Sequence, residues 1–384
     1  MGHDTEAADA NSPDMGAPDA RPEPEPIELS LCDVSILYPL PEAGAEQNDL
    51  LLGASDEGER GELLPEDVVE AIPTFPFVTQ DTISYDPLRV VGVRFDGCHD
   101  NGDGCEAQIR MVMQPISIRS DARDSALHLF YSLEDEVFRE ALEELRGLRA
   151  LSGDTDMTGP LRVHPVLSEQ GLSGEYASAL NALLLRYAGE ENLTRMTFFL
   201  RAPPLQETWF FGGFDREDGV LSEMEIVGVE GTQRVIRTEV AEGYNYAFSP
   251  EALMPEDGSA LFTSTSANAA SEVAREEAFA AFLRVENPSI YGVAELPCAG
   301  CHVATFITAA SRDAFALSDD SFLEDTYQAP QHDLTLTGQA VTTPSSLRAF
   351  GWFERRAVIA QRTVNETSAV LVDLAERFPA AEAE

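Results

Sequence analysis

Alternating apolar and polar residues predict β-strands through the middle of the chain. The runs that are rich in β-branched and aromatic residues are Leu88–Phe95, Ile109–Ile118, Ala126–Tyr131, Leu193–Leu200, Thr208–Phe214 and Met224–Val240. The turn-rich sequence DGCHDNGDGC separates the first two runs, which favours a hairpin-like pair. We therefore expect residues 27–250 to form an α+β body with a mostly antiparallel sheet and packed helices.

Apolar residues at helical spacing predict helices between and after these strands. Ser132 opens the first helix with Asp135 at the capping-box position, and residues 174–188 repeat the pattern. After Pro250 the β-branched runs thin out, and Val273–Leu283 has helical spacing. A last helix is expected around a capping box of Thr363 and Glu366, with Val370, Leu371, Leu374 and Phe378 as its apolar positions. Residues 251–384 are therefore predicted to be a mainly helical C-terminal segment.

Two acidic stretches lack this patterning. Residues 1–26 combine acids with prolines and have no Val, Ile, Leu, Phe, Tyr or Trp, so they are expected to form a disordered tether. Such a leader is typical of a segment that follows a lipid anchor, and no signal peptide is recognisable in it. Residues 41–70 are also rich in Asp and Glu and are predicted to form an exposed loop.

The charge of the chain excludes some classes of partner. Among 384 residues, 68 are Asp or Glu and 25 are Arg, with no Lys, so the formal net charge is −43. Nucleic acids and anionic membranes attract clustered cations, and we expect neither as a partner. Hydrophobic residues make up 43% of the chain, which suffices for a core, and no apolar run approaches the roughly 20 residues of a membrane span.

One motif carries recognisable chemistry. Cys298, Cys301 and His302 form the sequence C-x-x-C-H. Two thiols at this spacing can both reach the vinyl groups of one haem, and the adjoining imidazole can bind the iron. The motif therefore predicts one covalently attached haem c with His302 as the proximal ligand.

Two other interpretations of the motif stay open. Cys298 and Cys301 could form a disulfide or redox pair, although no thioredoxin-type β-rich run precedes them. The three residues could also bind zinc, although a second half-site at a suitable distance is missing.

The second axial ligand of the iron is harder to assign, because no Met follows the motif. His332 is the only downstream His and is the first candidate. Candidates from the first domain are His128, His164, Met111 and Met113. Without any of them the iron would be five-coordinate and open to peroxide or a diatomic gas. Apolar residues expected to shield the macrocycle are Val303, Phe306, Ile307, Phe350, Trp352 and Phe353.

The remaining cysteines are Cys32, Cys98 and Cys105. Cys98 and Cys105 bracket the turn between two strands, so they are predicted to form a disulfide, although Cys32 could pair with either. A disulfide and a haem c both form outside the cytoplasm, which predicts export. The turn itself lacks the acids of an EF-hand at the first and last positions, and only weak calcium binding by Asp96, Asp100 and Asp103 stays open.

Several stretches resemble uncharacterised secreted lipoprotein-type proteins of myxobacteria and their relatives. The resemblance would span most of residues 85–375 and is carried by His128–Leu133, Leu193–Phe199, Leu347–Phe353 and Gln361–Ser368. It implies export and lends no activity. The five positions 298–302 separately resemble the haem-attachment motif of c-type cytochromes.

These observations predict an exported monohaem c-type cytochrome-like protein, periplasmic or at the cell surface, that transfers electrons to a redox partner. A lipid anchor at the N-terminus would be its only membrane contact. Whether the protein is an enzyme stays open, because a haem peroxidase or small-ligand-binding haem enzyme is the first alternative. The second is a surface adhesion lipoprotein in which Cys298 and Cys301 form only a disulfide.

Overall fold

The fold is described from a computed structural model. It defines residues 28–75, 84–100, 104–202, 207–238, 247–250, 258–337 and 346–379. The proposed tether over residues 1–26 lies outside these ranges, as do the side chains of Asp100 and Asp103, two of the candidate calcium ligands.

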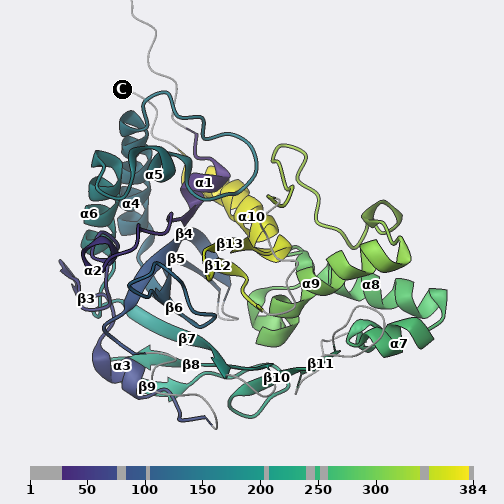
Figure 1. The fold of residues 1–384 in the computed structure, drawn as a ribbon. Helices are drawn as coiled ribbons and strands as arrows, with labels where there is room; N and C mark the ends of the chain where they lie inside the picture. The colour runs from purple at the N-terminus through teal and green to yellow at the C-terminus, as the bar shows by residue number, and fades with distance from the viewer. Residues whose placement is uncertain are drawn as a thin grey trace, which may run out of the picture.

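A nine-stranded antiparallel sheet forms the centre of the described structure (Figure 1). Its strands follow the order β1-β4-β5-β6-β7-β8-β10-β11, with β9 paired to β8. They are β1 Ser35–Leu37, β4 Leu88–Asp100, β5 Cys105–Pro115, β6 Ala126–Leu133, β7 Leu193–Ala202, β8 Glu207–Glu217, β9 Val220–Glu223, β10 Gln233–Thr238 and β11 Ala247–Pro250. The prediction of an α+β protein with a mostly antiparallel sheet is confirmed.

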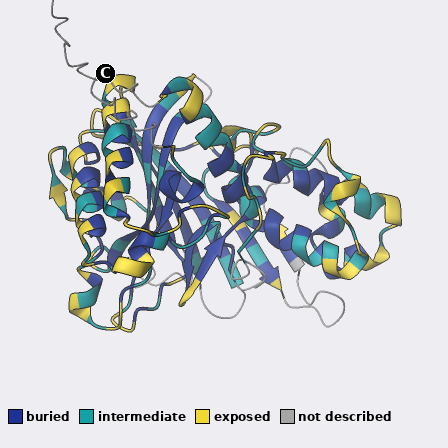
Figure 2. Ribbon diagram, turned by 90° about the horizontal axis from the view of Figure 1, so that it is seen from above, coloured by how far each residue is buried: buried dark blue, intermediate teal, exposed yellow. Residues whose placement is uncertain are grey.

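One face of this sheet packs against α4 (Asp135–Gly147) and α6 (Glu175–Tyr187), with α5 (Pro165–Gln170) beside them (Figure 1). We call it the packed face. Every second residue of β5 and β6 points into it and is almost completely buried, as Figure 2 shows by the dark strands beneath the helices. These residues are Ile109, Met111, Met113, Leu127, Leu129 and Tyr131.

The other face of the same strands carries the alternate residues. Across the sheet, Val112 pairs with His128, and His128 pairs with Thr197. In the next register Arg94 pairs with Arg110, Arg110 with Phe130, and Phe130 with Arg195. We call the side that carries these residues, together with Phe199 and Phe211, the histidine face.

Helices from the C-terminal part of the chain cover the histidine face. A second apolar core joins Phe199, Trp209 and Phe211 of the sheet to α8 and α9. The helices on this side are α7 Ser264–Ala269, α8 Glu272–Glu286, α9 Cys298–Phe315 and α10 Gln361–Arg377. A short hairpin, β12 Phe350–Phe353 and β13 Arg356–Ile359, lies before α10 and was not expected in a mainly helical segment.

Residues 41–70 differ from the expected exposed loop. They contain α2 Ala45–Asn48, α3 Glu66–Glu70 and the small strand pair β2 Glu57–Gly58 and β3 Gly61–Glu62, while α1 spans Leu31–Val34 before β1. The acids point outward, but the apolar residues between them enter the first core: Leu51, Leu52, Ala54, Leu63, Leu64 and Val68. The many acids of residues 41–70 led to the prediction of an exposed loop, but the apolar residues between them pack into the core.

Both predicted capping boxes are absent. Strand β6 continues to Leu133, and the Ser132 hydroxyl bonds to that of Thr194 instead of capping α4. Helix α10 begins at Gln361, so Thr363 and Glu366 lie inside it. Glu366 is used for ion pairs with Arg94 and Arg362, which a short-range sequence pattern cannot anticipate.

The cysteine prediction is confirmed for one pair. Cys98 and Cys105 form a disulfide across the β4–β5 hairpin, with Cα atoms 4.5 Å apart. Cys32 is buried and free, so the alternative in which it pairs with either of them is not realised. No helix within the described ranges combines the length and apolar character that a membrane crossing requires.

Candidate functional site

The C-x-x-C-H motif forms the first turns of α9, which begins at Cys298 with Pro297 as its N-cap residue. Positions i, i+3 and i+4 of a helix lie on one side, so Cys298, Cys301 and His302 share one side of α9. All three side chains are partly exposed, whereas Ala299 and Val303 are buried. The motif therefore presents its three functional side chains together.

The two thiols of the motif are separate. Cys298 and Cys301 are free cysteines and do not form a disulfide in the structure. Burial raises the pKa of Cys298 to about 12 and that of Cys301 to about 11, so both remain protonated near neutral pH. A redox-active thiol needs the opposite shift, because the thiolate is the nucleophile.

His302 is fixed by one hydrogen bond and two aromatic rings. Its Nδ1–H donates to the backbone carbonyl of Leu347 at 2.5 Å. The imidazole stacks on Phe199 at 5.3 Å between ring centres and lies 4.8 Å from the ring of Phe211. Because Nδ1 is the donor, Nε2 carries the free lone pair, and it has no hydrogen-bond partner among the described residues.

Electrostatics keeps this imidazole neutral. Burial is the main cause that lowers the pKa of His302 to about 4, and the nearby Arg348 guanidinium acts in the same direction. A neutral imidazole with a fixed tautomer is the form that binds a metal ion.

A buried ion pair supports the aromatic platform beneath His302. The Arg348 guanidinium lies 4.9 Å from the ring centre of Phe199 and 3.7 Å from the carboxylate of Asp124. Asp124 also accepts hydrogen bonds from Trp209 Nε1 at 3.0 Å and Ser346 Oγ at 2.8 Å. These contacts hold the segment before β12 against the sheet, and that segment supplies the Leu347 carbonyl.

His128 lies on the histidine face close to this group. It lies two residue pairs along β6 and β7 from Phe199, on the same face, because Ala126 pairs with Phe199 and His128 pairs with Thr197. Burial lowers the pKa of His128 to about 3, and His302 is the largest electrostatic contributor to that shift. The imidazoles of His128 and His302 therefore lie on the same side of the sheet.

The His128 ring has no hydrogen-bond partner among the described residues. Neither ring nitrogen forms a hydrogen bond with a described residue, and neither is sealed from solvent. His164, in contrast, accepts from Leu167 N and contacts the Tyr176 hydroxyl, so its ring is fully used in the first core.

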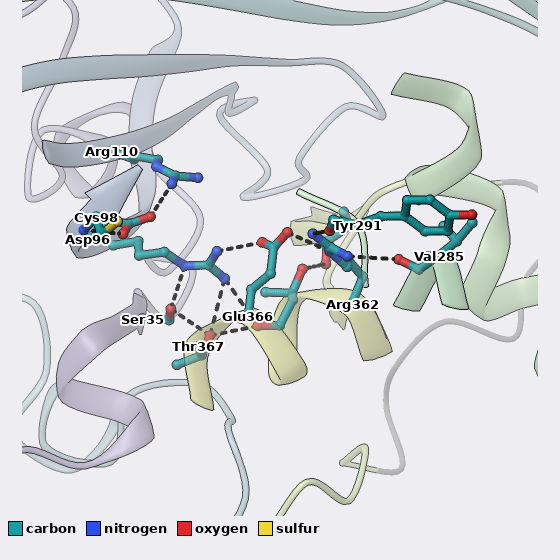
Figure 3. A network of polar contacts seen from close by, with 12 residues as sticks. Ser35, Asp96, Cys98, Arg110, Val285, Tyr291, Arg362, Glu366 and Thr367 are labelled. Atoms are coloured by element: carbon teal, nitrogen blue, oxygen red, sulfur yellow. Dashed lines mark hydrogen bonds and ion pairs between the residues drawn. The ribbon is translucent and has the colours of Figure 1, made fainter. Parts of the chain in front are cut away.

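A chain of polar contacts joins the sheet, α10 and α8 (Figure 3). Arg94 of β4 donates to Glu366 at 2.7 Å and to Ser35, and Glu366 also pairs with Arg362 at 2.6 Å. Arg362 donates to the carbonyls of Val285 and Tyr291. Although burial raises the pKa of Glu366, the guanidinium groups of Arg362 and Arg94 lower it to about 2. The network fixes α10 between the sheet and α8.

His332, the first sequence candidate for a second ligand, lies beside α10 in a cavity that the motif does not line. Its Nδ1 bonds to the Ser368 hydroxyl at 2.6 Å. It lines a cavity of about 430 Å³ whose lining does not include the motif. The other lining residues are Leu283, Glu286, Asp319, Thr326, Tyr327, Asp333, Leu334, Thr335, Gln361 and Asn365.

The other sequence candidates are distributed over both apolar cores. Met111 and Met113 point into the packed face, and His164 lies in the first core. The expected shielding residues divide: Val303, Phe306 and Ile307 join the core around α9, whereas Phe350 and Trp352 join the first core. Phe353 is buried and contacts the Arg356 guanidinium.

The sequence offered His128 as one candidate ligand beside His302, but it did not identify the residues that contact the His302 ring. These are Phe199, Phe211 and the carbonyl of Leu347. Leu347 contributes only its backbone carbonyl, and because every residue has one, the residue type does not indicate this contact. No three His, Cys, Asp or Glu side chains within the described ranges are grouped as ligands of a metal ion.

Comparison with protein-family models, curated protein sequences and solved structures finds no match to this chain.

Proposed function

We propose that the protein is an exported c-type cytochrome-like electron carrier with one haem attached through Cys298 and Cys301. In this proposal His302 is the proximal iron ligand. The observation that carries it is the joint presentation of two unpaired thiols and one imidazole with a free Nε2 on the first turns of α9. When bound, the haem supplies a one-electron redox centre.

The surroundings of His302 support this assignment. The hydrogen bond from Nδ1 to the Leu347 carbonyl fixes the ring and increases its basicity toward a metal. The rings of Phe199 and Phe211 exclude water on one side, and a low dielectric affects the redox potential. The raised thiol pKa values disfavour the alternative of a redox-active dithiol.

The disulfide between Cys98 and Cys105 supports export, since stable disulfides form in oxidising compartments. In the periplasm or at the cell surface, a strongly acidic carrier would meet a redox partner with a complementary basic surface. A lipid-anchored N-terminus would keep it near the membrane.

The test is expression in a host with haem-maturation machinery, followed by denaturing electrophoresis and haem staining. We expect the wild-type chain to retain haem after denaturation and the double variant Cys298→Ala/Cys301→Ala to lose it. Cys32→Ala is the matched control, because it removes a thiol outside the motif, and it should retain haem. A wild-type band without haem would contradict the proposal.

A further inference from the structure

We infer that His128 of β6 is the second axial ligand of the iron, so that the redox centre is held between the sheet and α9. This inference rests on the proposed function. It replaces His332, which the sequence favoured, with a residue about 170 positions upstream of the motif.

The placement of the two imidazoles carries the inference. His302 stands on the rings of Phe199 and Phe211, which belong to the histidine face. His128 projects from the same face, two residue pairs along β6 and β7 from Phe199. The two side chains therefore lie on the same side of the sheet and come from different elements, His128 from β6 and His302 from α9.

The hydrogen bonds of the four described histidine side chains distinguish the candidate iron ligands. His128 alone among His128, His164, His302 and His332 has no hydrogen bond to a described residue. The side chain of His128 is also partly exposed, so its ring nitrogens are available to a ligand. A neutral imidazole nitrogen without a protein partner is a suitable ligand for iron.

The surroundings of His128 favour a role as an iron ligand over a role in packing. Its neighbours across the strands are Val112 and Thr197, neither of which accepts or donates to the ring. On the packed face the same strand places leucines at positions 127 and 129. A residue needed only for packing at position 128 could be apolar without loss.

The experiment compares the ferric and ferrous absorption and electron paramagnetic resonance spectra of purified holoprotein. The variants are His128→Ala, His128→Met and the control His332→Ala, each expressed with haem-maturation machinery. We expect low-spin, six-coordinate iron in the wild type and in His332→Ala. His128→Ala should keep covalent haem but become high-spin, and added imidazole should restore the low-spin spectrum.

His128→Met tests the position with a different ligand atom and remains informative where the alanine variant folds poorly. It should stay low-spin, show a sulfur-to-iron charge-transfer band and have a higher midpoint potential than the wild type. Retained haem with spectra that do not respond to either change at position 128 would overturn the inference and leave the proposed function intact. A high-spin His332→Ala would likewise overturn it. Absence of covalent haem from the wild type would overturn both.

Discussion

The two faces of the central sheet use the same strands in opposite ways. On the packed face, Leu127, Leu129 and Tyr131 of β6 are almost completely buried against the first core. On the histidine face, His128 and Phe130 of the same strand keep partial exposure. Because side chains alternate along a strand, the two sides of one strand can face different surroundings. On the histidine face, Phe199 and Phe211 are buried in the second apolar core, whereas His128 stays partly exposed.

Removing a side chain from the packed face should have the largest effect on stability. Leu129→Ala deletes a fully buried side chain and leaves a cavity, which should lower the free energy of unfolding by about 3 to 4 kcal/mol. Thr197→Ala, on the histidine face, should change it by less than about 1 kcal/mol. Urea denaturation followed by circular dichroism measures both. Equal losses would show that the two faces do not differ as described.

A buried carboxyl should give a smaller, pH-dependent effect on the side of α8–α10. The pKa of Glu286 is raised from 4.5 to about 7, mainly by burial. Between these values the folded protein holds a proton that the unfolded chain has released, so stability falls as pH rises through this window. Glu286→Gln should remove this decline and stabilise the protein by about 2 kcal/mol at pH 8.

Unfolding curves at pH 5 and pH 8 check this prediction. The stabilisation by Glu286→Gln should be largest at pH 8 and small near pH 5, where Glu286 of the folded protein is already protonated. The Thr308 hydroxyl donates to Glu286 Oε1 at 3.3 Å, and the glutamine carbonyl can accept the same bond. A stabilisation that does not depend on pH would contradict the assignment to this carboxyl.

The smallest effect is expected at the outer part of the histidine face. Arg195 and Asp215 pair at 2.5 Å, with 28% and 41% of their side chains exposed. Solvent screens such a pair, so Asp215→Asn should cost about 0.5 kcal/mol and less in high salt. Thermal unfolding at low and high ionic strength measures the difference. A loss as large as that of Leu129→Ala would mean that solvent does not screen this ion pair.

Much of the sheet could be predicted from the sequence, because its strands alternate clearly between the two faces. Strands near Leu88–Phe95 and Leu193–Leu200 were expected almost where β4 and β7 lie. The disulfide between Cys98 and Cys105 followed from a turn that brings two strand ends together. These features depend on local patterns, and local patterns are visible in one sequence.

Long-range contacts explain what the sequence did not predict. The strand pair β12–β13 is short and forms in a region where helical spacing dominates. His332 was favoured because it follows the motif, but its position in space is set by Ser368 of α10. The neighbours of His302 come from β6, β7, β8 and the segment before β12, and only the folded chain brings them together.

The central claim is that the chain carries one haem through two thioether bonds on α9. Intact mass spectrometry under denaturing conditions, on protein made with haem-maturation machinery, tests it most directly. We expect the wild-type mass to exceed that of the bare chain by one haem, with one iron per chain, and Cys298→Ala/Cys301→Ala to have the bare mass. A wild-type chain at the bare mass and free of iron would contradict the account.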